Sequence, residues 1–335
     1  MDLDWQVAGV AGATGAVGSE LLTVLEGLAW GPPSVLPIAR ASSKQTSIEW
    51  SGQQVGVDVL GEADLETVDL LFVALPDHVS GEIIRAAVDL DIRVVDISGA
   101  AWRDALGPLC VPWLQADRVP GDARVLCVPS AEALLVASVL EPLRRAGITG
   151  AAHAHVLMPA SAHGRAAVEE LSQQVVALFN AQTPKRKIFR TGLAFDVDPI
   201  VSTLRDDGWT EREHEVLEQV RGLCAAPDMP ISVSLTQIPI FSGVSVECSI
   251  QLDRQVPVEL LERVLRDGGV RWATDGSDTP LARPRSVEGN PFAHGARLRL
   301  NASGDTLFVW ASMDNLRTPA VAAAMCARLL LGGTG

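Results

Sequence analysis

A short apolar segment, a glycine-rich turn and an amphipathic segment follow one another without a gap near the start of the chain. Residues 7–11 are small and apolar, the next seven include Gly12, Gly15 and Gly18, and residues 19–25 carry apolar side chains at helical spacing. In a strand–turn–helix unit these glycines permit a tight turn, close approach of the backbone to a pyrophosphate, and close helix packing. The helix N-terminus adds N–H donors and partial positive charge. The segment therefore predicts nucleotide binding, the alternative being a close-packed turn without a ligand.

Strands and helices alternate through the first part of the chain, and the pattern changes near residue 151. Alternation predicts a parallel, doubly wound sheet of the Rossmann type. The later strands are longer and are separated by amphipathic helices, which predicts an inserted α+β domain with a mixed or antiparallel sheet. We expect residues 1–131 plus 313–335 to form the nucleotide-binding domain and residues 132–312 the second domain. The predicted strands are 34–39, 68–75, 93–99, 123–129, 153–158, 231–235, 244–252, 297–300 and 307–312, and the helices are 81–90, 165–180, 211–223 and 319–331.

Charge and cysteine usage exclude several classes of function. A net charge of −14 repels nucleic acid, and the one basic run, residues 184–187, is interpreted as a solvated loop. Five scattered cysteines without CxxC pairs indicate neither a disulfide framework nor a zinc site, so no metal is expected. No apolar run reaches the roughly 18–20 residues of a membrane span. We expect a cytoplasmic protein that binds neither nucleic acid nor membrane.

The residues after the predicted second strand bear on the choice of cofactor. An adenosine ribose would lie near residues 40–44, where no Asp or Glu is present to hold two ribose hydroxyls. Arg40 and Ser42, with the neighbouring Ser43 and Lys44, suit a 2′-phosphate instead, which favours NADP over NAD. An ordinary polar loop is the alternative, and NAD remains possible.

Several segments together resemble the aspartate-β-semialdehyde dehydrogenase family over almost the whole chain. They are the glycine turn, Asp96–Arg103 for the family's Asp-x-Ser-Ser-Ala-Phe/Trp-Arg with one extra residue, and 194–199, 218–221 and 313–317 for three downstream motifs. The resemblance implies a dinucleotide-binding domain completed by the last helix, with a dimer-forming catalytic domain inserted. The expected cofactor contacts are Gly12, Thr14, Gly15, Ala16, Val17, Gly18, Arg40, Ser42 and Asn315.

The same resemblance implies that the family's chemistry is missing. In the family a cysteine attacks an acyl phosphate, a histidine moves the proton, an arginine grips the substrate carboxylate, and NADPH reduces the thioester. Here Ala131 occupies the cysteine position, Val244 the histidine position and Gln237 the arginine position. Alanine cannot form a thioester, so we expect no catalytic residue of the family type and no thiol-dependent reaction.

Three other side chains are candidate substitutes for the missing groups. Ser130 has a hydroxyl whose pKa lies far above that of a thiol and would need a strong adjacent base. Cys127 lies on a predicted strand and is interpreted as a small buried hydrophobe. His163 lies where the family has Ser-Gly-Ala-Gly at the rim of its active site, and it is either a displaced base or an ordinary loop histidine.

The pattern is similar to the Usg-type branch of the family, whose members lack the full catalytic set. The resemblance implies a ligand site at Arg103, Glu218, Arg221 and Gln237 for a small anionic ligand, although surface salt bridging of the charged groups is the alternative. We therefore expect an NADP-binding homologue that has lost the dehydrogenase reaction. The alternatives are a non-catalytic dimeric regulator or partner of an active homologue, and a different reaction that uses Ser130 or His163. A homodimer is expected from the family and from a broad apolar face on the second domain's sheet.

Overall fold

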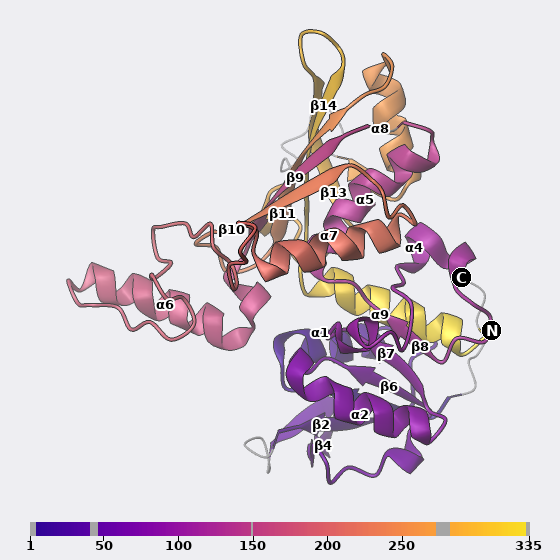
Figure 1. Ribbon diagram of the computed structural model, residues 1–335. Coiled ribbons are helices and arrows are strands. Elements are labelled where there is room, and N and C mark those ends of the chain that lie inside the picture. The colour runs from indigo at the N-terminus through magenta and orange to yellow at the C-terminus, as the bar shows by residue number, and fades with distance from the viewer. Residues whose placement is uncertain (1–4, 41–45, 149, 273–281, 333–335) are drawn as a thin grey trace. The chain divides into compact units, whose positions relative to one another are not determined.

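The structure, a computed structural model, describes residues 5–40, 46–148, 150–272 and 282–332 (Figure 1). The chain divides into two compact units. Unit 1 contains Met1–Ser130 and Pro319–Gly335, and unit 2 contains Ala131–Thr318. The last helix, α9 (Arg317–Leu330), thus lies almost entirely in unit 1, although it follows the whole of unit 2 in the sequence.

Unit 1 is built on a six-stranded parallel sheet, which confirms the doubly wound prediction. The strand order is β5-β2-β1-β6-β7-β8, and every neighbouring pair is parallel. From β1 the chain continues to β2 on one side and later to β6 on the other, so the order reverses beside the carboxyl end of β1. Ligands of doubly wound sheets bind at such a switch point. The strands are β1 Val7–Ala11, β2 Ser34–Ala39, β5 Asp58–Val59, β6 Leu70–Val73, β7 Arg93–Asp96 and β8 Val125–Cys127.

The helices of unit 1 follow the strands as expected, with one shifted boundary. Helix α2 spans Asp77–Asp89 and begins four residues before the predicted start, because Pro76 fixes the entry to the helix and the Asp77 carboxylate accepts the His78 N–H. The remaining elements are α1 Ala16–Glu26, η2 Leu65–Thr67, α3 Ala100–Arg103, α4 Pro112–Gln115, η3 Ala116–Arg118 and the hairpin of β3 Ser47–Trp50 with β4 Gln53–Gly56.

Unit 2 contains a six-stranded mixed sheet, as the sequence predicted. The order is β10-β9-β11-β14-β13-β12, with parallel pairs at both edges and antiparallel pairs between them. Helix α5 packs on β11 and β14 and contacts both α7 and α8, so these helices cover one face of the sheet. The strands are β9 Ala152–Met158, β10 Ile231–Gln237, β11 Val244–Gln251, β12 Arg271–Trp272, β13 His294–Leu300 and β14 Thr306–Met313, and the helices are α5 Ala131–Arg145, η4 Ala160–His163, α6 Arg165–Phe179, α7 Glu211–Leu223, α8 Val258–Asp267 and η5 Pro284–Ser286.

The other face of this sheet is polar along β9 and β10 but carries aromatic side chains on β14, where Phe308 and Trp310 are half-buried. The less buried positions of β9 include His153 and His155, and those of β10 are Ser232, Ser234 and Thr236. Alternation along β9 and β10 directs most apolar residues under the helices and leaves mostly polar residues on the open face. A second copy would therefore find polar groups along these two strands.

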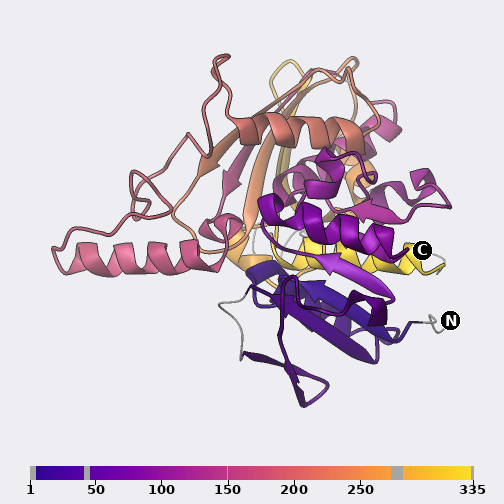
Figure 2. The same ribbon diagram turned by 60° about the horizontal axis from the view of Figure 1, so that its bottom comes forward.

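Helix α6 extends away from the sheet of unit 2, as both ribbon views show (Figures 1 and 2). The loop that follows it returns along the helix and is held by two buried side chains. Glu170 accepts the N–H groups of residues 187–189, and Gln174 accepts those of Leu193 and Ala194. Because buried acceptors with several N–H partners fix the backbone, the loop has a defined path.

Candidate functional site

The glycine turn of unit 1 requires glycine at two of its three positions. Gly12 has φ +93°, and a Cβ there would lie 2.5 Å from the Ala74 carbonyl oxygen. A Cβ on Gly18 would lie 2.1 Å from the Gly12 carbonyl oxygen, so this glycine allows α1 to pack against the turn. Gly15 has ordinary φ of −74°, and the nearest atom to its added Cβ is 3.1 Å away. Packing therefore explains Gly12 and Gly18 but does not require Gly15.

The start of α1 has the donor groups that a pyrophosphate needs. The Ser19 N–H donates to the Gly15 carbonyl, so the N–H groups of Ala16, Val17 and Gly18 belong to the first turn and point out of the helix end. The first turn carries no acidic side chain. This donor set fits the phosphates of a dinucleotide without a competing negative charge. Thr14 lies half-buried at the same turn.

The predicted 2′-phosphate site is only partly described. Arg40 follows β2 at the carboxyl end of the sheet and is exposed, so its guanidinium is accessible to an anion. Ser42 lies outside the described residues, together with Ser43 and Lys44. NADP preference therefore stays a prediction that rests on Arg40.

Arg103 of unit 1 is paired with a carboxylate. Its Nη1 atom lies 2.7 Å from Asp77 Oδ2, across from the start of α2. Partial burial raises the pKa of Asp77, but hydrogen bonds from Arg103 and from the His78 N–H outweigh this and hold the pKa below its usual value. An incoming anion would have to compete with Asp77 for this guanidinium. The geometry favours the salt-bridge alternative for Arg103.

Cys127 is confirmed as a buried small hydrophobe. It is fully buried on β8, and its thiol donates to the Gly107 carbonyl at 3.3 Å. Burial raises the pKa of the thiol strongly, with Asp96 and Cys110 adding to the rise. A thiol with this environment is not a nucleophile.

Two of the residues singled out in the sequence, Ala131 and Val244, lie in unit 2 and have side chains without proton-transfer chemistry. Ala131 is the first residue of α5 and is half-buried, and Val244 is the first residue of β11 and is fully buried. Asn315 is 5% exposed; its Oδ1 accepts the Gly243 N–H at 2.8 Å, and its amide also bonds Ser161. Its part in cofactor binding stays a prediction.

Gln237 makes two hydrogen bonds at the end of β10. Its Nε2 donates to the Met158 carbonyl at 2.9 Å, and its Oε1 lies 2.9 Å from His163 Nε2. The structure thus brings together two residues singled out in the sequence for different reasons. Burial within the surrounding protein lowers the pKa of His163, and the bond to Gln237 only partly opposes this. His163 is therefore a neutral imidazole near pH 7.

A partly buried ion-pair cluster lies close to His163 and was not predicted from the sequence. Glu132, 3% exposed on α5, accepts Arg212 Nη2 at 2.8 Å, and Arg212 Nη1 donates to Glu215 at 2.7 Å. Burial would raise the pKa of Glu132, but Arg212 holds it below its usual value, and His163 contributes to the same lowering. The available sequence signal was an acid within the apolar start of α5, because such an acid needs a partner.

A cavity of about 590 Å³ lies beside His163 and Gln237 within unit 2. Gln237 lines it from the end of β10 and His163 from the end of η4, and residues 188–191, Asp198 and residues 200–204 line the rest. Ser202 connects the cavity to the ion-pair cluster, because its hydroxyl oxygen accepts the Arg212 backbone N–H at 2.9 Å. Neither the cavity nor its link to Glu132 was predictable from local sequence.

The remaining predicted ligand residues form their own pair. Arg221 Nη1 donates to Glu218 Oε1 at 3.0 Å, one turn apart on α7. This contact again favours salt bridging. Over the described residues, no group of three or more His, Cys, Asp or Glu side chains suits a metal ion, and no helix has the length and apolar character to span a membrane.

Two family models cover most of the chain. Residues 7–121 match the NAD-binding domain of semialdehyde dehydrogenase, and residues 140–318 match the semialdehyde dehydrogenase dimerisation domain. Unit 1 is thus an NAD-binding domain and unit 2 a dimerisation domain. The chain belongs to the semialdehyde dehydrogenase family.

Individual relatives agree with this assignment. An aspartate-semialdehyde dehydrogenase from Rickettsia bellii is 25% identical over 92% of both chains, and a USG-1 protein homologue from Azotobacter vinelandii is 26% identical over 96% of both. The crystal structure of aspartate semialdehyde dehydrogenase II from Vibrio cholerae, complexed with ASA, superposes with a TM-score of 0.90 over 99% of both chains at 22% identity. This last likeness shows the fold.

Proposed function

We propose that the protein binds NADP at the glycine turn of unit 1 but does not carry out the thiol-dependent reaction implied by its family resemblance. The observation that carries this proposal is the chemistry at three positions of unit 2. Ala131 and Val244 have no group that can attack or move a proton, and Gln237 has no charge to hold a carboxylate. Cys127, the cysteine nearest to Ala131 in the sequence, is buried, and burial raises the pKa of its thiol. Under this proposal, acylation, proton transfer and binding of the substrate carboxylate each lack the side chain that would carry them out.

Isothermal titration calorimetry with NADP tests the cofactor half of the proposal. Gly15→Ala should weaken NADP binding roughly tenfold or more, because the added methyl group occupies the approach of the pyrophosphate and requires only a shift of a few tenths of an ångström from the Gly12 carbonyl oxygen, 3.1 Å away. Gly27→Ala is the matched control at the other end of α1, where an added Cβ is 3.6 Å from its nearest neighbours. No heat with NADP or NAD at millimolar concentration would rule out a working nucleotide site.

Arg40 provides the test of cofactor choice. Arg40→Ala should weaken NADP binding and leave NAD binding unchanged, because only NADP carries the 2′-phosphate that the guanidinium would meet. Equal losses for both cofactors would contradict the assignment of Arg40 to the 2′-phosphate.

A small anion is proposed to bind Arg103 or Arg221 by exchange for the carboxylate already present. Asp77 and Glu218 are both partly exposed, so each can move into solvent when an anion arrives. Such exchange implies weak affinity. Inorganic phosphate titrated against the wild type and against Arg103→Gln and Arg221→Gln measures it, and an unchanged affinity in both variants would exclude these sites.

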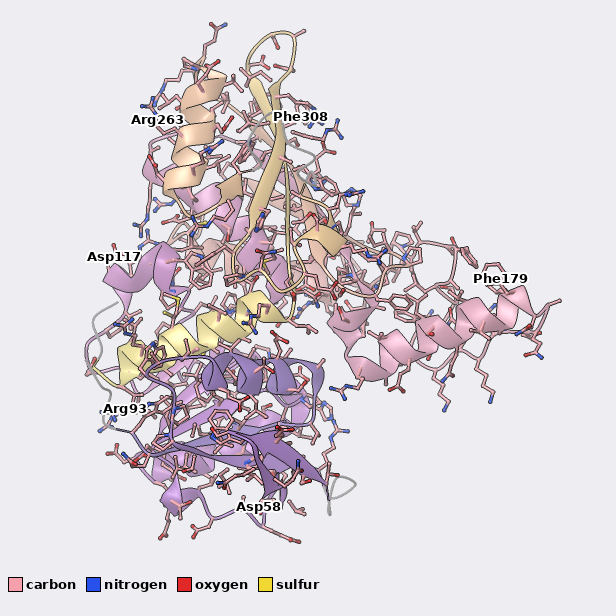
Figure 3. All side chains as sticks on the ribbon, turned by 180° about the vertical axis from the view of Figure 1, so that it is seen from behind. Asp58, Arg93, Asp117, Phe179, Arg263 and Phe308 are labelled. Atoms are coloured by element: carbon pink, nitrogen blue, oxygen red, sulfur yellow. The ribbon has the colours of Figure 1, made fainter. Side chains whose placement is uncertain are left out.

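We further propose a homodimer, in keeping with the dimerisation domain. Exposed apolar groups available to a second copy lie on α6 and the following loop. Phe179 and Phe195 are 79% and 68% exposed and contact each other edge to face at 5.8 Å. Figure 3 shows Phe179 at the free end of α6. Light scattering should give twice the chain mass, and Phe179→Ser should shift the equilibrium toward monomer.

A further inference from the structure

The hydrogen bonds of Gln237 determine which nitrogen of His163 carries the proton. The Met158 carbonyl can only accept, so the amide nitrogen of Gln237 faces it and the amide oxygen faces His163. That oxygen can also only accept. His163 Nε2 must therefore carry a hydrogen and donate it across the 2.9 Å contact.

The other nitrogen of His163 is then a hydrogen-bond acceptor. A neutral imidazole carries one N–H, and because it lies on Nε2, Nδ1 keeps its lone pair. The ring is fixed by the bond to Gln237 and by an edge-to-face contact with Phe189, whose centroid lies 5.8 Å away. The imidazole remains solvent-accessible and is one of the side chains that line the cavity.

The charges around the cavity disfavour an anion. One guanidinium, Arg212, lies between the carboxylates of Glu132 and Glu215, which leaves one net negative charge behind Ser202. Among the lining residues, Arg190 and Asp198 carry opposite charges. Gln237 adds no charge. The cavity therefore offers acceptors and no surplus of positive charge.

We propose that this cavity binds a small uncharged molecule that carries a hydroxyl group, with Nδ1 of His163 accepting the hydroxyl proton in a hydrogen bond and Gln237 fixing the imidazole. The site is built from residues of unit 2 alone, and it shares no residue with the glycine turn or with the proposed anion exchange at Arg103 and Arg221. A failure to bind NADP would therefore not contradict this proposal. A failure to bind the hydroxyl compound would likewise not contradict the proposed NADP site.

The first test is the tautomer, read from the side-chain nitrogen resonances of the histidines at neutral pH. His163 should be a single Nε2–H tautomer in the wild type and a mixture in Gln237→Leu. His153 and His155 are internal controls, because their partners Ser232 and Thr236 have hydroxyls that can donate or accept and do not fix a tautomer. A wild-type His163 that is protonated on Nδ1, or a mixture, would overturn the proposal.

The second test compares two molecules with the same four-carbon chain, butane-1,4-diol and succinate, as probes of the dimeric full-length protein. The diol should shift the His163 resonances saturably, whereas succinate should act no more than sodium chloride of equal ionic strength. His163→Phe should abolish diol binding, and His155→Phe, on the open face of the same sheet, should leave it unchanged. Succinate binding as tightly as the diol, or no saturable effect of the diol on the folded wild type, would refute the site.

Discussion

Removing Arg212 should destabilise unit 2 far more than removing its acidic partner. In Arg212→Met, the carboxylate of Glu132 is left 3% exposed without a guanidinium, and breaking a buried pair in this way costs about 3–5 kcal/mol. In Glu132→Gln, the guanidinium keeps its 2.7 Å bond to Glu215, so the cost is about 1–3 kcal/mol. The double variant should be more stable than Arg212→Met alone, because no orphaned charge remains.

The pH dependence of these variants follows from the direction of the shift at Glu132. The wild-type pKa is lowered in the folded state, so the pair stabilises the protein above the unfolded pKa of about 4.3 and loses this effect as the pH falls through the folded pKa. In Arg212→Met, burial without a cation raises that pKa instead. Protonation of Glu132 then removes the unpaired charge in the variant. The difference in the free energy of unfolding between Arg212→Met and wild type should therefore be smaller at pH 5 than at pH 8.

Urea unfolding followed by far-ultraviolet circular dichroism measures the free energies, and hydrogen exchange of α5 peptides assigns the change to unit 2. Arg266→Met is the surface control, since its 2.9 Å contact with Glu262 is a half-exposed i, i+4 pair worth about 0.3–0.5 kcal/mol. Equal costs for Arg212→Met and Glu132→Gln, or a deficit that does not vary with pH, would refute the reasoning.

Four further outcomes follow from the described contacts. Gly18→Ala should destabilise unit 1 by about 3 kcal/mol or more, because its Cβ would lie 2.1 Å from a backbone oxygen, and thermal unfolding measures the loss. Thr210→Ala should cost about 1 kcal/mol in urea unfolding through loss of the capping box on α7. The Cys127 thiol should resist alkylation at pH 8 until the protein is unfolded, as mass spectrometry of its peptide will show. Ala131→Cys alone should yield no dehydrogenase activity in a coupled NADPH assay, because groups that act as a unit return little when one is restored.

Local sequence patterns predicted the elements that depend on local physics. The glycine turn follows from the steric demands of Gly12 and Gly18, and α7 begins at the predicted residue, where Thr210 and Glu213 form a capping box. The longer strands in the second part of the sequence predicted the mixed sheet of unit 2. The sequence pattern predicted that α2 begins at Gly81. The helix begins at Asp77 instead, because Pro76 and Asp77 set the boundary.

The candidate site depends on contacts between residues far apart in the chain, and these were not predictable. Glu132 and Arg212 are 80 positions apart, and His163 and Gln237 are 74 apart. The sequence indicated His163 and Gln237 as separate candidates. They come together only because the end of β10 lies beside η4. The three-dimensional contacts show the hydrogen-bond partners of His163 and Gln237, which the sequence did not indicate.

The most direct test of the central claim is phosphate-dependent formation of NADPH from aspartate semialdehyde by the unmodified protein at high enzyme concentration. With Ala131, Gln237 and Val244 in place, we predict no detectable turnover, although calorimetry of the same preparation should show NADP binding. Turnover at a rate typical of enzymes, ~1–10³ per second, would contradict the account, because it would require Ser130, His163 or another group to carry the reaction.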